Sequence, residues 1–180
     1  QKHLTLLDGH PLTAHDIVYS FDRINDPKVG AIMLSSYYAK SGIKKAVALD
    51  DYTVEFYLDR VYVFALEKIG YLSIVPKHIY EGQDFRKAPQ NRAPIGSGPM
   101  KFREWKAGRH IKLEKNENYW RSDLGKSPAY SGVVFKIIPD QSVAFQALKK
   151  GQIDFMGMTM VQWAKQTLSE KFNKRYVKAS

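Results

Sequence analysis

The sequence contains no cysteine among its 180 residues. This absence excludes disulfide bonds, zinc sites built on thiolates and a cysteine nucleophile, and it is compatible with either redox compartment. Long apolar runs are absent too, since none approaches the about 18 residues that a membrane-spanning helix needs. No signal peptide is recognisable, and Gln1 rather than a methionine comes first. We therefore expect a chain that was processed or cut from a longer one.

The composition is that of a globular protein. Hydrophobic residues make up 44% of the chain, charged residues 26% and aromatic residues 13%, which indicates a buried core rather than disorder. The net charge of +10 raises the question of nucleic-acid binding. Basic residues are nevertheless spread among acidic ones, and no nucleic-acid module surrounds the single dense cluster of Lys171, Lys174, Arg175 and Lys178. A solvated basic surface is the better interpretation, and we expect no nucleic-acid partner.

The hydrophobic pattern predicts a mixed α/β fold. Thr13 and Asp16 form the pattern of a capping box, before a helix that ends near Pro27. The alternating segments 43–49 and 52–58 predict a hairpin, with Asp50 and Asp51 as turn residues. The other expected elements are helices at 31–39, 62–69, 140–150 and 160–168, and strands at 100–106, 110–115, 132–138 and 153–155.

Two of these elements carry more detailed expectations. The segment 132–138 is almost continuously apolar, which is typical of a strand buried on both faces. In the helix that Asp140 caps and Gly151 closes, an apolar stripe is expected. Its members are Val143, Ala144, Ala147 and Leu148. A loop rich in proline, glutamine and asparagine at 81–94 is the best internal boundary.

The sequence offers no arrangement that supports catalysis or metal binding. Ser97 lies between Gly96 and Gly98, but this triplet is neither a nucleophile elbow nor a phosphate-binding loop. The better interpretation is a backbone turn in which the glycines take special dihedral angles. His10 and His15, with Asp8 and Asp16 nearby, match no known metal-site spacing and are interpreted as exposed polar residues. We expect no enzyme activity, no metal and no cofactor.

Four segments together resemble the bacterial extracellular solute-binding proteins of family 5, the dipeptide-, oligopeptide- and nickel-binding components of ABC importers. They occur in the family's order and span residues 8–154, which is most of the chain. They are residues 8–23 (DGHPLTAHDIVYSFDR), 48–56 (ALDDYTVEF), 94–105 (PIGSGPMKFREW) continuing to Trp120, and 138–154 with its IPD and ALKKGQID stretches. Two positions depart from the family pattern: Met100 stands where an aromatic is usual, and Ser97 replaces a frequent threonine.

The resemblance implies part of the larger lobe of a two-lobed, class II periplasmic-binding-protein fold, with a mixed sheet and flanking helices. It implies that residues 1–93 belong to the second subdomain of that lobe and residues 94–180 to part of the first. The implied function is capture of a peptide or related solute between two lobes, for delivery to the permease subunits of an ABC importer. The implied location is periplasmic or on the cell surface.

For ligand contacts, the resemblance suggests two places in this chain. The Gly96-Ser97-Gly98 turn is a candidate because glycine lets another backbone approach closely. Tyr37 and Tyr38 are candidates because an aromatic loop can cover a side-chain pocket. Local packing is an equally good explanation for both places.

Several alternatives remain open at this point. Within the family, the ligand can be a nickel complex, an oligosaccharide or an opine instead of a peptide. Outside it, the alternatives are a fragment of a hydrolase and a basic domain that associates with nucleic acids. Open strand edges in an isolated piece also lead us to expect self-association.

Overall fold

The structure, a computed structural model, describes residues 4–125 and 127–177, which form two compact units. The first unit holds the described residues up to Trp105 together with Lys112–Val133. The second holds Lys106–Ile111 and the described residues from Val134 onward. Lys178 of the basic cluster lies outside the described residues. The predicted subdomain boundary at residue 93 concerns the complete lobe and stays a prediction.

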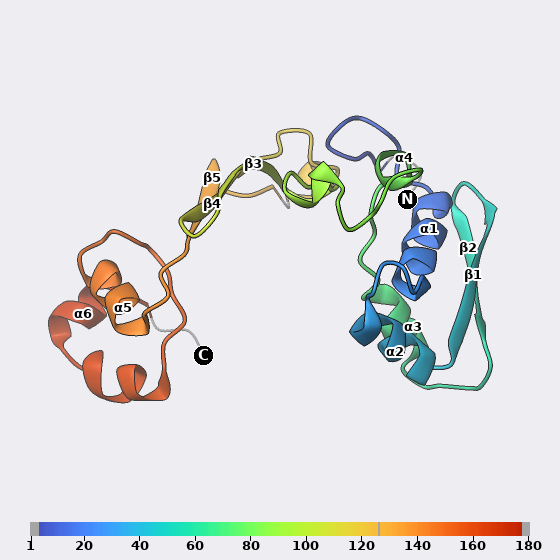
Figure 1. The fold of residues 1–180 in the computed structure, drawn as a ribbon. Coiled ribbons are helices and arrows are strands. Elements are labelled where there is room, and N and C mark those ends of the chain that lie inside the picture. Colours follow the sequence, from blue (N-terminus) through green and yellow to red (C-terminus); the bar gives the residue numbers. More distant parts are fainter. Residues whose placement is uncertain (1–3, 126, 178–180) are drawn as a thin grey trace. The chain divides into compact units, whose positions relative to one another are not determined.

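The elements follow one another along the chain in a mixed α/β order (Figure 1), which confirms the predicted fold class. The first part of the chain forms α1 (Ala14–Asn25), α2 (Ile32–Lys40), β1 (Ile43–Asp50), β2 (Thr53–Leu58), α3 (Ala65–Gly70) and α4 (Lys77–Tyr80). The later part forms β3 (Met100–Lys106), β4 (His110–Lys115), β5 (Gly132–Lys136), α5 (Gln141–Lys149), a π-helix (Gln162–Gln166) and α6 (Glu170–Arg175). Within the described residues, none of the helices has the length and apolar character that a membrane crossing requires.

Helix α1 begins at the predicted capping box. The carboxylate of Asp16 accepts hydrogen bonds from the Thr13 amide at 2.8 Å and from the Thr13 hydroxyl at 3.2 Å. The apolar face of α1 packs against the β1–β2 hairpin (Figure 1), where Phe21 and Ile24 enter the core. The sequence indicates Asp16 only as part of a helix start. In the structure Asp16 is also buried, since it is only 5% exposed.

The β1–β2 hairpin is antiparallel, with Ala46 opposite Phe56 and Ala48 opposite Val54. Asp50 closes its turn by accepting hydrogen bonds from the Tyr52 amide and the Thr53 hydroxyl, at 2.7 and 2.9 Å. This confirms the predicted hairpin and the turn role of the aspartates. The core of the first unit lies between the hairpin, α1 and α2. Its buried members are Phe21, Ile24, Tyr38, Ile43, Ala46 and Leu72.

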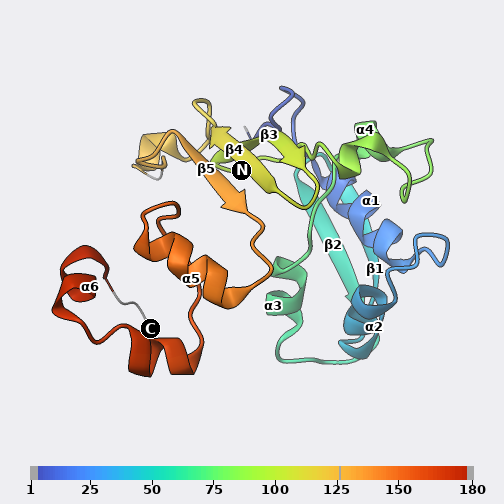
Figure 2. The ribbon, with the colours of Figure 1, turned by 60° about the vertical axis from the view of Figure 1, so that its left-hand side comes forward.

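The second sheet has the strand order β3-β4-β5 (Figure 2). The prediction that residues 132–138 are buried on both faces is wrong. Val134, Phe135 and Ile137 are 52%, 56% and 42% exposed. One reason is that β5 is an edge strand of a three-stranded sheet, so in the described chain it has one neighbouring strand.

Helix α5 confirms its predicted cap and corrects its predicted stripe. Asp140 accepts a hydrogen bond from the Val143 amide at 2.8 Å. Val143 itself is 57% exposed, whereas the unpredicted Phe145 is 1% exposed. The buried face consists of Ala144, Phe145, Ala147 and Leu148. At about 100° per residue, Val143 lies roughly 120° from the middle of that face.

The end of the chain differs from the prediction in three further respects. Residues 153–155 do not form a strand. Ile153 packs against the buried cluster of Phe145, Leu148 and Phe172, while Phe155 is 86% exposed. The helix predicted at 160–168 is a short helical segment that continues as the π-helix. Helix α6, which the pattern did not predict, begins at Ser169, whose hydroxyl accepts a hydrogen bond from the Phe172 amide.

Candidate functional site

The Gly96-Ser97-Gly98 turn is held by hydrogen bonds to its three backbone carbonyls. The Gly96 carbonyl accepts from the Leu7 amide at 2.9 Å. The Ser97 carbonyl accepts from the indole N–H of Trp120 at 3.1 Å, and the Gly98 carbonyl from the Asn116 side chain at 3.0 Å. Donors from two distant segments therefore fix this turn, although no regular element contains it.

The two glycines of this turn do not need to be glycine for conformational reasons. Neither has a positive φ, so the expectation that they take special dihedral angles is wrong. A Cβ atom built on Gly96 meets nothing within 4 Å, and one on Gly98 only the Met100 carbonyl oxygen at 3.9 Å. Because neither strain nor packing in the described chain explains glycine at position 96, the space beside it is open to another molecule or segment.

Tyr37 and Tyr38 lie in the last turn of α2 but in different surroundings. Tyr38 is 2% exposed and packs edge-on against Phe21, with 5.6 Å between ring centroids. This burial raises the pKa of the Tyr38 phenol. Tyr37 is half-buried, and the ammonium of Lys68 lies 3.7 Å from its ring centroid. Local packing thus accounts for Tyr38, while a ligand contact by either tyrosine stays a prediction.

Trp120 and Asn116 support the candidate turn, a role that the sequence pattern did not predict for either residue. Asn116 also donates its backbone amide to the carbonyl of Pro99 at 2.9 Å, so it binds both the turn and the residue that follows it. The N–H group of a tryptophan that is at least partly buried needs a hydrogen-bond acceptor. The presence of a tryptophan at position 120 is therefore the one sequence signal for this role. The identity of that partner depends on tertiary structure and is not visible in the sequence.

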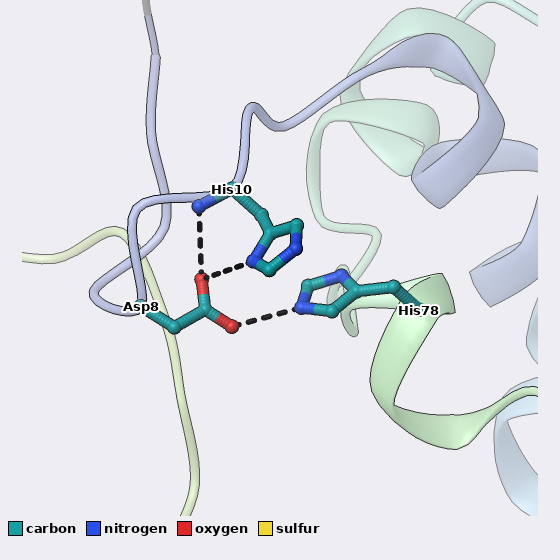
Figure 3. Close-up of side chains that lie close together, drawn as sticks. All are labelled: Asp8, His10 and His78. Atoms are coloured by element: carbon teal, nitrogen blue, oxygen red, sulfur yellow. Dashed lines mark hydrogen bonds and ion pairs between the residues drawn. The ribbon is translucent and has the colours of Figure 1, made fainter.

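The four residues weighed as a metal cluster separate into two groups. His15 lies 3.5 Å from Asp51, and Asp16 is buried at the start of α1. Asp8 and His10 remain neighbours, and His78 of α4, which the sequence pattern did not indicate, lies beside them (Figure 3). Burial opposes ionisation of Asp8. Hydrogen bonds from His78 and from the His10 amide outweigh it, so the pKa of Asp8 lies below its ordinary value.

Comparison with known proteins gives one consistent family. The sequence model described as "Bacterial extracellular solute-binding proteins, family 5 Middle" matches residues 6–180. The curated oligopeptide-binding protein AppA of Bacillus subtilis is 32% identical over 181 residues, which cover 96% of this chain and 31% of AppA. The chain therefore spans about a third of the length of this relative.

Solved structures agree with this likeness. The structure of Bacillus subtilis AppA in complex with a nonapeptide matches 96% of this chain and 33% of its own, with a TM-score of 0.74 and 30% identity. NikZ of Campylobacter jejuni in complex with Ni(L-His) matches 85% of this chain and 29% of its own, with a TM-score of 0.72 and 28% identity. The fold recurs in proteins with very different bound molecules.

Proposed function

Since this chain belongs to the bacterial extracellular solute-binding proteins of family 5, we propose that it is part of the substrate-binding component of an ABC importer. The complete protein captures a peptide between two lobes and passes it to the permease subunits in the membrane. The observation that carries this proposal is the match to AppA, a protein named for oligopeptide binding and solved with a nonapeptide.

The Gly96-Ser97-Gly98 turn forms part of the ligand-facing wall in this proposal. Its carbonyls are occupied by Leu7, Trp120 and Asn116, so the turn is rigid before any ligand arrives. Apart from the neighbouring residues in the chain, no described protein atom lies within 4 Å of the place where a Cβ on Gly96 would stand. A rigid turn without side-chain bulk allows the backbone of an extended peptide to come close.

The second candidate is a non-peptide solute bound by the same fold, such as a metal complex. The likeness to NikZ, solved with Ni(L-His), favours keeping this candidate. The two candidates differ in the size of the ligand. Mass spectrometry of the ligand that copurifies with the full-length protein separates them.

The role proposed for this chain is binding without catalysis. The family to which it belongs consists of solute-binding proteins, and its description places them outside the cell. We extend this to a periplasmic or lipid-anchored location for the complete protein. Fractionation of the source cells into cytoplasm, periplasm and membrane checks that location.

The test of peptide capture is calorimetric titration of the full-length protein with a mixture of oligopeptides. We expect binding of about micromolar affinity or tighter. A protein that binds no oligopeptide but retains a different copurified solute would contradict peptide capture and favour the second candidate.

The wall is tested by the substitution Gly96→Val. Because the site is open and φ is not positive, the variant should unfold like the wild type and yet bind peptide at least about tenfold more weakly, or about 1.4 kcal/mol. Gly70→Ala in α3 is the matched control, since a Cβ there also meets nothing within 4 Å. Unchanged peptide affinity in Gly96→Val would contradict the proposal that the turn forms part of the ligand-facing wall.

A further inference from the structure

Asp8, His10 and His78 form a compact cluster of metal-ligating side chains outside the candidate turn (Figure 3). Asp8 and His10 come from the loop before α1, and His78 comes from α4, 70 positions from Asp8 in the sequence. One ligand atom from each residue lies within 4.8 Å of the other two. The fold therefore brings together two imidazoles and a carboxylate.

The distances approach those of a metal coordination sphere. The Nε2 atom of His78 lies 2.8 Å from Oδ2 of Asp8, and Nδ1 of His10 lies 3.5 Å from Oδ1 of Asp8. Nitrogen and oxygen ligands about 2.1 Å from a tetrahedral metal are about 3.4 Å from one another. The 2.8 Å separation therefore has to widen by about 0.6 Å for an ion to be held. The widest separation, at most 4.8 Å, has to shrink by no more than about 1.4 Å.

The loop that carries Asp8 and His10 is fixed by its own hydrogen bonds. The His10 amide donates to the Asp8 carboxylate at 3.1 Å, and the Leu6 amide donates to the His10 carbonyl at 2.8 Å. Gly9 makes this turn possible, because its φ of 89° is unfavourable for any residue with a Cβ atom. Both ligands are consequently placed before a metal arrives.

The position of His78 is fixed independently from α1. The Lys77 amide donates to the buried carboxylate of Asp16 at 2.8 Å, and the Val75 amide donates to the buried hydroxyl of Ser20 at 2.8 Å. These two bonds attach the start of α4 to α1. A one-turn helix would be a weak platform by itself, but here two buried side chains of a longer helix hold it.

The charge and the arrangement of the rings also suit a cation. The imidazoles of His10 and His78 are stacked, with 4.0 Å between centroids and 22° between planes. Both face the single carboxylate of Asp8, His10 through Nδ1 and His78 through Nε2. A divalent ion placed between these atoms can bond both nitrogens and the carboxylate at once.

We propose that Asp8, His10 and His78 bind a divalent transition-metal ion of the zinc and nickel type. Two nitrogens and one oxygen form a donor set that suits these ions better than calcium or magnesium, which prefer oxygen ligands only. The side chains are 22%, 59% and 32% exposed in the order Asp8, His10 and His78, so an ion can enter from solvent. Three protein ligands leave room for water or for a small ligand.

The test is calorimetric titration of the tag-free full-length protein, first dialysed against a chelator, with ZnCl₂ and NiCl₂. We expect binding of one ion per chain at this cluster, and no comparable heat with CaCl₂. His10→Ala is the main variant, because that exposed side chain can be removed without disturbing α4. It should weaken the affinity for Zn²⁺ at least about tenfold, and His78→Ala should do the same.

His15→Ala is the matched control. His15 also lies 3.5 Å from an aspartate and is 54% exposed, but within the described chain it lacks a second histidine ligand. We expect its affinity for Zn²⁺ to stay within about twofold of the wild type. Failure of the wild type to bind Zn²⁺ and Ni²⁺, or binding that His10→Ala leaves unchanged, would overturn the proposal. Neither outcome affects peptide capture, which is measured separately.

Discussion

At the scale of single residues, Asp16 stabilises more of the first unit than the start of one helix. Its two carboxylate oxygens accept three hydrogen bonds, two from Thr13 and one from the Lys77 amide. The first two stabilise the start of α1, and the third attaches α4 to it. A charged acceptor that satisfies buried amides contributes more than an exposed cap of the same kind.

Replacement of Asp16 by alanine should lower the free energy of unfolding by about 2–4 kcal/mol, because the Thr13 and Lys77 amides lose their acceptor. Urea unfolding followed by circular dichroism measures the loss. Asp22→Ala, at an exposed position of the same helix, is the control and should cost no more than about 0.5 kcal/mol. Equal stabilities of the two variants would show that the bonds of Asp16 do not hold α4 to α1.

At the scale of elements, the end of α5 shows how backbone geometry selects a residue. The Gly151 amide donates to the Leu148 carbonyl at 2.8 Å, and the Gln152 amide donates to the Ala147 carbonyl at 2.9 Å. This pair of bonds is the Schellman motif, and it requires the left-handed conformation in which Gly151 has a φ of 73°.

The substitution Gly151→Ala should lower the free energy of unfolding of the second unit by about 1 kcal/mol, owing to the strained φ. A Cβ there would also collide with Nη2 of Arg175, but that flexible side chain can move away. Thermal unfolding compares the variant with Gly157→Ala, which has open space and no positive φ and should be nearly neutral. A neutral Gly151→Ala would contradict the strain argument.

Elements that local residues specify were predictable from the sequence, as the caps at Thr13 and Asp140 and the hairpin turn at Asp50 demonstrate. Features that depend on what lies opposite a segment were not. The apolar run of β5 predicts burial, but its exposure depends on the strands and layers that the fold supplies. The candidate turn was found by resemblance. The roles of Trp120 and His78 depend on contacts with segments that are distant in the sequence, so the sequence alone did not predict them.

At the scale of the whole molecule, the function of a two-lobed binding protein depends on closure around the ligand. The ligand stabilises the closed state by contacts to both lobes, which one part of one lobe cannot provide. This chain spans about a third of the length of its curated relative. The ligand-facing wall proposed to include Gly96 would therefore be one contributor among several.

The 180-residue chain, produced alone, should bind oligopeptides far more weakly than the full-length protein, or not at all. Parallel calorimetric titrations of the two proteins with the same peptide mixture check this expectation. Micromolar affinity of the isolated chain would mean that the main contacts lie within it. Exposed apolar side chains such as Met33 and Leu66 make self-association of that chain a prediction too, which light scattering at high concentration checks.

The hydrogen bond from Leu7 to Gly96 has a practical consequence. Leu7 immediately precedes Asp8 of the proposed metal cluster, while its amide proton is held by the turn proposed to face the ligand. The rate at which this one proton exchanges with deuterium should therefore respond both to zinc binding at the cluster and to peptide binding at the turn. If zinc and peptide each slow the exchange, the signal of a single amide reports the binding of two different molecules.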